Sequence, residues 1–378
     1  MATILRMVVD QMITPAPNGI SRYTEELTRA LVSTAPRGCS VEGIVSALPQ
    51  EKIARIEEAL PGLSQLHRTT LPRRELAAAW QLGIVPTLGT GMIHSPSLLA
   101  PLRRHDREFD QTQMVVTIHD TLAWSDPKSL TPTSVAWHKA MAKRARKHAD
   151  AIVVPTHAVA EQLSDIIDFG DRVRVISGAV ASNLTLPDDA DERAARMELP
   201  EEFMLTVGTL DPRRGLTPLI TGLGQPDAPD LPLLVLGPET WGELALASVA
   251  DEAGLAEGRV RALGYLSDAD LAVVLARTSV FIYPSLREGF GLPLVEAFTF
   301  GAPVVHSDDP ALVEVAGGAG LAVERGAKGY PERLAAAVAS VLADSELADR
   351  MRIAGQDRAR AFSWRDSAER VWALHADL

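Results

Sequence analysis

The sequence predicts an α/β protein made of two doubly wound, Rossmann-like domains. The chain has 378 residues, which exceeds what one ordinary hydrophobic core accommodates and favours two domains. Short runs rich in Val, Ile and Leu alternate with segments of helical period, a pattern typical of buried parallel strands covered by helices. Ligands of such sheets bind at the carboxyl ends of the strands. We therefore expect the two domains to face a central cleft.

Each expected strand is a short apolar run that ends in turn residues. In the first half of the chain these runs are 3–10, 41–48, 92–96, 113–120, 151–156 and 172–177. In the second half they are 203–209, 231–238, 259–265, 279–285, 302–307 and 320–324.

The domain boundary is expected in the acidic, proline-containing stretch "NLTLPDDADERAARMELPEE" at 183–202, whose composition is typical of a linker or hinge. We predict a first domain at 1–185, a linker at 186–201 and a second domain at 202–358. The amphipathic segment 359–378 is expected to form a final helix.

Composition and charge exclude several classes of protein. Hydrophobic content of 46% and charged content of 23% indicate a globular chain, and no apolar run is long enough to span a membrane. The N-terminus lacks the features of a signal peptide, and Cys39 is the single cysteine, so a cytoplasmic setting is expected. The net charge of -12 is concentrated in the second half, where 17 Lys and Arg face 31 Asp and Glu from residue 187 on. This argues against a nucleic-acid partner.

The most informative stretch is "YPSLREGFGLPLVEAFTFGAPVV", at 283–305. A helix is expected to begin near Leu292, because Pro293 is tolerated in a first turn. The amides and dipole of a helix N-terminus suit a diphosphate, and Gly289 and Gly291 allow backbone to approach a ligand closely. Glu288 lies before the turn.

The two glutamates of this stretch could bind hydroxyl groups on either side of a diphosphate. Glu288 could accept hydrogen bonds from a sugar, and Glu296, one turn into the helix, from the vicinal diol of a ribose. Together they favour a nucleotide sugar as ligand. Taken singly, each glutamate is better explained as a favourable charge near a helix N-terminus.

These residues resemble the signature of family-4 retaining glycosyltransferases, which have the GT-B fold. The resemblance covers most of the chain and is greatest to bacterial mannosyltransferase-like enzymes. It rests on further motifs that occur in the family's order: "NGISRYTEELTRAL" at 18–31, "IHSPSLLAPLR" at 93–103, "VVTIHDTLAWSDP" at 115–127, "VGTLDPRRGLTPLI" at 207–220, "VRALGYLSDADL" at 260–271 and "FSWRDSAERV" at 362–371. It implies that the helix at 359–378 crosses back to the first domain.

The resemblance also implies roles for residues of the second domain. Glu288 would bind the donor sugar and Glu296 the ribose, while the amides of Phe290, Gly291 and Leu292 would lie near the sugar and diphosphate. Arg213 and Arg214 stand where the family typically carries an Arg-Lys pair that neutralises the departing diphosphate.

Thr209 occupies a donor-binding position where many relatives carry another arginine. That departure leaves fewer cations to meet the diphosphate. A solvated charge pair is the ordinary alternative for the two arginines.

In the first domain, Gly19 would let the N-terminal loop close over the diphosphate. His119 ends an expected strand and, by the resemblance, would donate a hydrogen bond to the donor sugar. His94 ends another strand and is expected to face the same cleft, although it is ranked below His119.

No metal or other cofactor is expected. Asp268 and Asp270 match an Asp-x-Asp pattern that holds metals in other transferases, but Ser267 followed by acids is an ordinary helix N-cap. The basic helix 137–151 could contact an anionic membrane face peripherally, although a solvated face is its default interpretation.

The resulting hypothesis is a retaining glycosyltransferase that moves a hexose from a nucleotide diphosphate sugar to an acceptor hydroxyl. GDP-mannose is favoured as donor by resemblance, and the acceptor is a saccharide, glycolipid or small molecule. A GT-B sugar-nucleotide epimerase and a non-enzymatic sugar-binding module are the alternatives.

Overall fold

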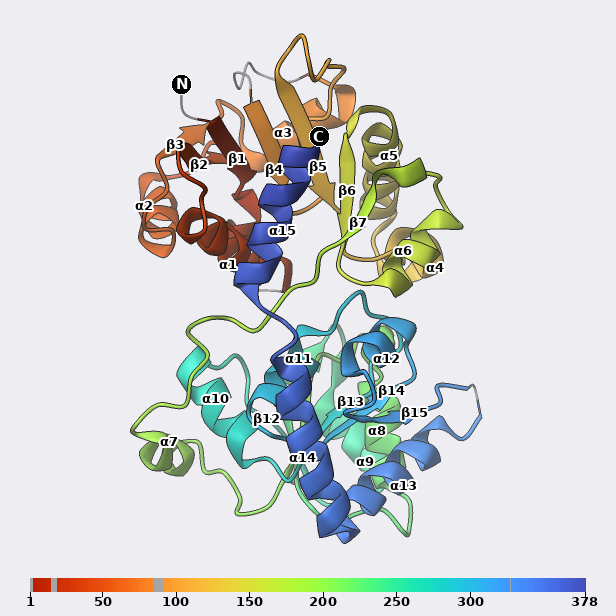
Figure 1. Cartoon of the computed structure of the whole chain (residues 1–378). Coiled ribbons are helices and arrows are strands. Elements are labelled where there is room, and N and C mark those ends of the chain that lie inside the picture. The colour runs from red at the N-terminus through yellow and green to blue at the C-terminus, as the bar shows by residue number, and fades with distance from the viewer. Residues whose placement is uncertain (1–2, 15–18, 85–90, 327) are drawn as a thin grey trace. The chain divides into compact units, whose positions relative to one another are not determined.

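The computed structural model describes residues 3–14, 19–84, 91–326 and 328–378. These residues form two compact units, each with its own parallel sheet and covering helices (Figure 1). Unit 1 comprises Met1–Gly178 and Ser363–Leu378, and unit 2 comprises Ala179–Phe362.

Unit 1 contains a seven-stranded sheet in the order β3-β2-β1-β4-β5-β6-β7, and every neighbouring pair is parallel. The strand order reverses between β1 and β4, so the carboxyl ends of these two strands form the topological switch point. The strands are β1 (Thr3–Val8), β2 (Cys39–Val45), β3 (Gln65–Arg68), β4 (Gly91–Ser95), β5 (Thr112–Thr117), β6 (Ala151–Val154) and β7 (Val173–Val175).

Helices cover both faces of this sheet (Figure 1). They are α1 (Gly19–Ser33), α2 (Gln50–Ala59), α3 (Arg73–Leu82), α4 (Leu122–Ser125), α5 (Pro132–His148), α6 (His157–Ser164) and α15 (Trp364–Asp377), with short 3-10 turns η1 (Asp10–Ile13), η2 (Pro127–Ser129) and η3 (Gly170–Arg172).

Helix α15 completes unit 1. Ser363 caps its N-terminus by accepting a hydrogen bond from the amide of Asp366, and the side chain of Ser367 donates to the carbonyl of Ser177 at 2.7 Å. The indole of Trp372 donates to the carbonyl of Leu31 in α1 at 3.3 Å. The buried face of α15 therefore lies against α1, at the other end of the sequence.

Unit 2 contains a six-stranded parallel sheet in the order β12-β9-β8-β13-β14-β15. Numbered within the unit this is the order 3-2-1-4-5-6 of a dinucleotide-binding fold, with its switch point between β8 and β13. The strands are β8 (Met204–Val207), β9 (Leu233–Leu236), β12 (Val260–Ala262), β13 (Val280–Tyr283), β14 (Val304–Ser307) and β15 (Leu321–Val323), and a separate hairpin pairs β10 (Thr240–Trp241) with β11 (Leu244–Ala245).

Two hydrophobic clusters lie on the two faces of this sheet, because alternate strand residues point to opposite sides. Phe281 belongs to one cluster and its neighbour Ile282 to the other. The helices of unit 2 are η4 (Pro212–Arg214), α7 (Ala190–Arg196), α8 (Leu216–Leu223), α9 (Leu246–Glu252), α10 (Asp268–Arg277), α11 (Leu292–Thr299), α12 (Pro310–Ala316), α13 (Tyr330–Ala343) and α14 (Ser345–Ala359).

The stretch expected to be a linker, 186–201, lies inside unit 2, and the division between units falls at Gly178 and Ala179 instead. Charged residues of this stretch pair with residues of α10. Arg193 of α7 pairs with Asp270 of α10 at 2.9 Å, and Arg277 pairs with Asp191. These ion pairs hold α7 against α10. The segment 186–201 is therefore a fixed part of unit 2, although its composition is typical of a hinge.

The last helix also begins later than expected. Residues 359–362 end α14 and the turn after it within unit 2, and α15 starts at Trp364. Among the described residues, no helix combines the length and apolarity needed to cross a membrane.

Candidate active site

The switch point of unit 2 brings together the loops that follow β8 and β13. Gly215, which ends the turn η4, has φ of +68°, and a Cβ at this position would lie 2.0 Å from the carbonyl oxygen of Pro284. Only glycine permits this approach. The amide of Leu286 donates to the carbonyl of Arg213 at 2.7 Å, which fixes the two loops to each other. The turn carrying Arg214 is thus held beside the turn carrying Glu288.

The Glu288 carboxylate is held by three donors that converge on one oxygen. The hydroxyl of Tyr283 donates to its Oε1 at 2.8 Å and that of Ser285 at 2.7 Å, and the guanidinium of Arg214 donates to the same atom. Among the described residues, no hydrogen bond to Oε2 is observed. The carboxylate is fixed in orientation, and one of its oxygens is left to accept hydrogen bonds.

Charge coupling in this cluster favours the ionised form of Arg214. The neighbouring carboxylate of Glu288 raises the pKa of Arg214 further above its usual value. Burial, and secondly the charge of Glu288, raise the pKa of Tyr283 well above its ordinary value. Tyr283 is therefore a neutral donor at neutral pH. An acid bound by charge-assisted hydrogen bonds in a partly dry site is a strong, fixed acceptor.

The two arginines expected to meet the diphosphate have different environments. Arg213 pairs through Nε with the buried carboxylate of Asp211 at 2.8 Å, and Asp211 also caps η4. The hydroxyl of Thr209 accepts from the amide of Asp211 at 3.3 Å, so Thr209 stabilises the same turn. Arg213 and Thr209 thus shape the loop, whereas the guanidinium of Arg214 reaches Glu288.

The helix α11 begins at Leu292, as the sequence predicts. Gly291 is its N-cap, with φ of +88°, and a Cβ there would lie 2.5 Å from a methyl carbon of Leu312. The ring of Phe290 packs edge-on against that of Phe362 with centroids 5.3 Å apart. This packing fixes the turn of Gly289, Phe290 and Gly291 at the helix N-terminus.

Glu296 lies one turn into α11 and is 7% exposed. It is near enough to Tyr283 for its charge to contribute to the raised pKa of that phenol. A nearly buried glutamate in the first turns of a helix is more than a solvated helix-end charge.

Sequence reasoning missed four residues of this site. Tyr283 and Ser285 lie within the motif itself, but their hydroxyls carry no signal until the turn is folded. Asp309 caps α12 by accepting from the amide of Ala311 at 3.0 Å, and it pairs with Arg325 at 2.9 Å. Burial raises the pKa of Asp309, and the charge of nearby Glu288 adds to this shift. The Asp-Pro step before α12 is a helix-start signal that could have identified Asp309.

In unit 1, His119 follows the carboxyl end of β5, where the sequence predicts it. Its Nε2 lies 2.8 Å from the carbonyl oxygen of Pro96, and the ring of Tyr23 from α1 packs edge-on against it with centroids 4.7 Å apart. Burial lowers the pKa of His119, so the ring is neutral at neutral pH. Its single N–H is directed to Pro96, which leaves Nδ1 as an acceptor.

The other two residues singled out in the first domain are Gly19 and His94. Gly19 is exposed and begins α1; the residues before it lie outside the described part of the chain. The expectation that His94 faces a cleft is wrong. His94 is 0% exposed within β4, and its ring lies against His375 of α15 with centroids 5.7 Å apart. Its strand is central in the sheet and covered by that helix.

The Asp-x-Asp pattern forms a helix cap. The hydroxyl of Ser267 accepts from the amide of Asp270 at 3.2 Å, Asp270 pairs with Arg193, and Asp268 accepts from Asn183 at 2.8 Å. Within the described residues, no group of three or more His, Cys, Asp or Glu side chains is placed to hold a metal ion.

The site residues of unit 2 therefore come together as expected: Glu288, Arg214 and the N-terminal turn of α11 surround one switch point. Two Rossmann-like units, one with paired charges at its switch point, are the architecture that the GT-B fold requires.

Comparisons with known proteins agree with this class. The family model described as "Glycosyltransferase Family 4" matches residues 17–183, and that described as "Glycosyl transferases group 1" matches residues 188–358. The chain is a glycosyltransferase and belongs to family 4.

Its relatives include mannosyltransferases. The O-antigen chain mannosyltransferase B of Escherichia coli is 27% identical over 80% of this chain and 77% of the relative. The serotype-specific mannosyltransferase WbdA of Escherichia coli is 31% identical over 45% of this chain, but the match spans only 22% of that longer protein. The crystal structure of Anabaena Alr3699/HepE in complex with UDP-glucose matches the whole of both chains with a TM-score of 0.74 at 18% identity, a likeness of fold.

Proposed function

We propose that this protein transfers a hexose, with mannose favoured, from a nucleotide diphosphate sugar to an acceptor hydroxyl with retention of the anomeric configuration. The observation that carries the proposal is the Glu288 carboxylate, which three donors hold through one oxygen at the switch point of unit 2. A fixed acceptor beside a helix N-terminus suits a sugar hydroxyl next to a diphosphate.

Each group of this site has one role in the proposal. The free oxygen of Glu288 accepts from hydroxyls of the donor sugar, and Glu296 accepts from the ribose. The amides at the start of α11 and the remaining N–H groups of Arg214 stabilise the diphosphate. Arg213 is mainly a positioning residue, because its guanidinium already pairs with Asp211.

The reaction needs no protein nucleophile in this proposal. The bond between the anomeric carbon and the diphosphate oxygen breaks, a bond to the acceptor oxygen forms on the same face, and the departing phosphate takes the acceptor's proton. The protein then acts by positioning and by stabilising charge. His119 would accept a hydrogen bond from a sugar hydroxyl through Nδ1, which revises the donor role that the resemblance implies.

The mannose preference is supported by two relatives that are mannosyltransferases. GDP-mannose is accordingly the first donor to test. UDP-sugars come next, since the solved Anabaena structure contains UDP-glucose. The acceptor is a saccharide, a glycolipid or a small molecule, and the setting we propose is cytoplasmic.

A thermal-shift panel of GDP-, UDP-, dTDP- and ADP-sugars tests the donor. A ligand that binds the folded state raises the melting temperature in proportion to RT ln(1+[L]/Kd). We expect the largest rise with GDP-mannose, and slow release of mannose when no acceptor is present. Stabilisation by a UDP-sugar alone would overturn the mannose preference. Stabilisation by no nucleotide sugar would overturn the proposed site.

A further inference from the structure

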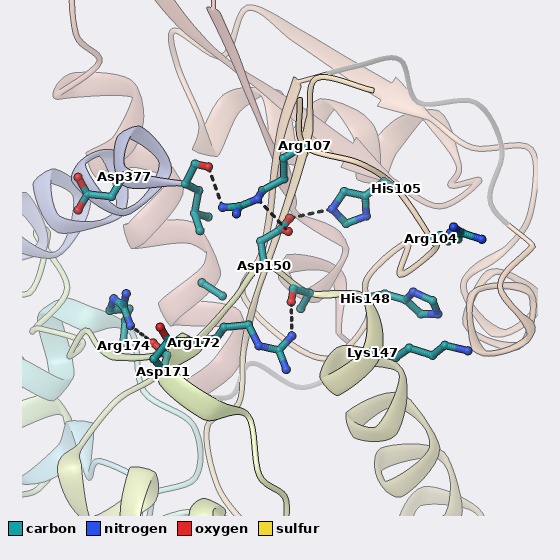
Figure 2. A pocket seen from close by; sticks show the side chains of 13 residues that line it. Arg104, His105, Arg107, Lys147, His148, Asp150, Asp171, Arg172, Arg174 and Asp377 are labelled. Carbon is teal, nitrogen blue, oxygen red and sulfur yellow. Dashed lines mark hydrogen bonds and ion pairs between the residues drawn. The ribbon is translucent and has the colours of Figure 1, made fainter. Parts of the chain in front are cut away.

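Unit 1 has a concave site at the edge of its sheet opposite His119. This basic pocket has a volume of about 490 Å³ and includes Arg104, Arg107, Lys147, His148, Arg172 and Arg174 among its lining residues (Figure 2). Lys147 and His148 end α5, and Arg172 precedes β7. The pocket therefore lies at the amino ends of parallel strands, whereas His119 follows the carboxyl end of β5.

The pocket is basic although the chain as a whole has a net charge of -12. Five Arg and Lys side chains and three Asp side chains line it. The protonated form of His105 is favoured, because both of its ring nitrogens face acceptors. Its Nε2 lies 2.8 Å from Asp150 and its Nδ1 lies 3.0 Å from the carbonyl of Arg103. The hydrogen bond to Asp150 is the main reason that the pKa of His105 is raised.

Two of the arginines are fixed in place by backbone carbonyls. Arg172 donates to the carbonyls of Ala149 at 2.7 Å, Arg146 at 2.8 Å and Phe169 at 3.0 Å. Arg107 donates to the carbonyl of Leu378 at 2.7 Å. Cations at the C-terminus of a helix are ordinarily explained by its dipole and its unpaired carbonyls. That explanation accounts for Arg172, which caps α5.

The same explanation does not account for Arg104 and Lys147. Within the described residues, neither side chain has an ion pair or a hydrogen bond, and both are exposed at the pocket. His148 lies between them in the view of Figure 2. Burial, and then the charges of Arg144, Lys147 and His105, lower the pKa of His148. The electrostatic potential at the pocket is thus positive. Arg104 and Lys147 remain available to bind an anion, because the described internal contacts of the pocket do not use them.

We propose that the basic pocket binds a phosphate group. Arg104 and Lys147 contact the anion directly, and Arg107 and Arg172 supply a preorganised positive wall. The phosphate belongs either to a soluble phosphorylated compound or to the headgroup of an anionic lipid. The side chain of Phe109, two residues after Arg107, is 90% exposed, and it would enter the interface in the second case.

The direct test uses His148 as a sensor of the bound anion. The whole protein is titrated by NMR in the absence and presence of inorganic pyrophosphate, and the His148 signal is assigned with His148→Gln. Bound pyrophosphate should raise the pKa of His148, because an anion stabilises the imidazolium. The double variant Arg104→Ala/Lys147→Ala should weaken pyrophosphate binding by about tenfold or more. Lys143→Ala is the matched control, since Lys143 is exposed one turn earlier on α5 and does not line the pocket.

A second arm separates the two sources of phosphate. Co-sedimentation with vesicles that contain phosphatidylglycerol should retain the protein if the phosphate is lipid-borne. Phe109→Ser should then reduce vesicle binding and leave pyrophosphate binding unchanged. If the wild-type protein binds vesicles and Arg104→Ala/Lys147→Ala does not, the proposal is supported even when pyrophosphate binds weakly. The proposal is overturned if neither probe binds, or if Lys143→Ala weakens binding as much as the double variant does.

Discussion

The two units share the same strand order around their switch points, but buried polar groups differ between the switch point of unit 2 and the surface of unit 1 beneath α15. In unit 2 the buried polar groups at the switch point are charged and bonded to one another. In unit 1 the groups beneath α15 are neutral and mostly unpaired. The comparison shows that a region meeting a charged ligand buries charges bonded to one another, whereas a helix-packing surface buries neutral groups.

Unit 2 uses ion pairs. Glu288 receives three donors, and Asp309 pairs with Arg325. A buried charge without such partners would cost several kcal/mol. The bonded groups are therefore held in fixed orientations beside the switch point.

Unit 1 buries His94 and His375 side by side. Among the described residues, both nitrogens of His94 and the Nε2 of His375 lack a hydrogen-bond partner, while the Nδ1 of His375 lies 2.9 Å from the side chain of Gln113. Burial alone lowers the pKa of His94 to about 3. Burial, and then the charge of His94, lower that of His375 well below its usual range. Neutral rings fill space here without serving a ligand.

The largest expected effect comes from breaking the charge cluster of unit 2. Glu288→Gln should lower turnover by about ten- to a hundredfold, because a charge-assisted hydrogen bond contributes roughly 1.5–3 kcal/mol. Affinity for the nucleoside diphosphate should not fall, since that ligand lacks the sugar and Arg214 is released from its pair. Steady-state kinetics and calorimetric titration measure the two quantities.

Glu296→Gln and Glu332→Gln are the matched variants. Glu296→Gln should weaken the diphosphate and the intact donor alike, because both contain the ribose. Glu332 carries only a first-turn charge on α13, so its change should leave both quantities unaltered. If Glu288→Gln and Glu296→Gln behave like Glu332→Gln, the two acids are merely helix-end charges.

Acid should weaken unit 1 before unit 2. His94 is protonated near pH 6.5 in the unfolded chain but only near pH 3 in the folded chain. The contribution of this residue to folding stability is therefore fully present above pH 6.5 and is lost as the pH falls below that value. Between pH 7 and pH 5 this residue alone should cost about 2 kcal/mol. Tryptophan fluorescence during denaturation measures the effect, because Trp241 is the single tryptophan of unit 2 and unit 1 holds the other five.

His94→Leu should flatten this pH dependence, because it removes the titrating ring. His157→Gln is the control, since His157 is exposed, and it should leave the slope unchanged. An equal slope in wild type and His94→Leu would show that the buried histidine is not responsible.

A smaller expected effect on stability distinguishes two costs of replacing a glycine in unit 2: the strain of a positive φ and the steric clash of an added Cβ. Gly215→Ala and Gly254→Ala both place a side chain at positive φ, but a Cβ at Gly254 meets nothing within 4 Å. Gly215→Ala should therefore destabilise the protein by roughly 1 kcal/mol more than Gly254→Ala. It should also lower turnover, because the Arg214 turn must shift. Equal melting temperatures would mean that the loop contact with Pro284 relaxes freely.

The smallest expected effect is that of chelation. The Asp268 and Asp270 carboxylates are used by Asn183 and Arg193, and Arg214 supplies positive charge at the proposed donor site. Transferase activity should therefore persist in excess EDTA. Loss of activity in EDTA and its recovery with manganese or magnesium would place a metal in the reaction.

Twelve of the strands lie where the apolar runs predict them, although the observed strands are shorter at one or both ends. Strand β3 was missed because Gln65–Arg68 is polar and lies at the sheet edge, where one side of a strand faces solvent. The β10–β11 hairpin was missed because two-residue strands have no measurable period.

The sequence predicts which segments form the site, but it predicts less well which side chains contact one another. The turn of Gly291 and the start of α11 follow from local chemistry, whereas the Arg214–Glu288 pair joins residues 74 positions apart. That pair depends on the close approach of Gly215 to Pro284, which no local pattern reports. The prediction for His94 was wrong for a related reason, because His94 is covered by α15, a helix that begins at Trp364 and is therefore far away in the sequence.

The position of α15 also has a consequence for the order in which the molecule can form. Residues 363–378 leave the ribosome after all of unit 2, yet they carry Trp364, Val371 and Trp372 of unit 1, which are each at most 8% exposed. Domains generally fold during synthesis from the N-terminus onward, and here that order is reversed. Unit 2 is continuous and can close first, while the face of unit 1 beneath α15 stays open to the nascent-chain environment until synthesis reaches the last helix. A chaperone that binds exposed apolar surface would find its substrate in the first half of this chain.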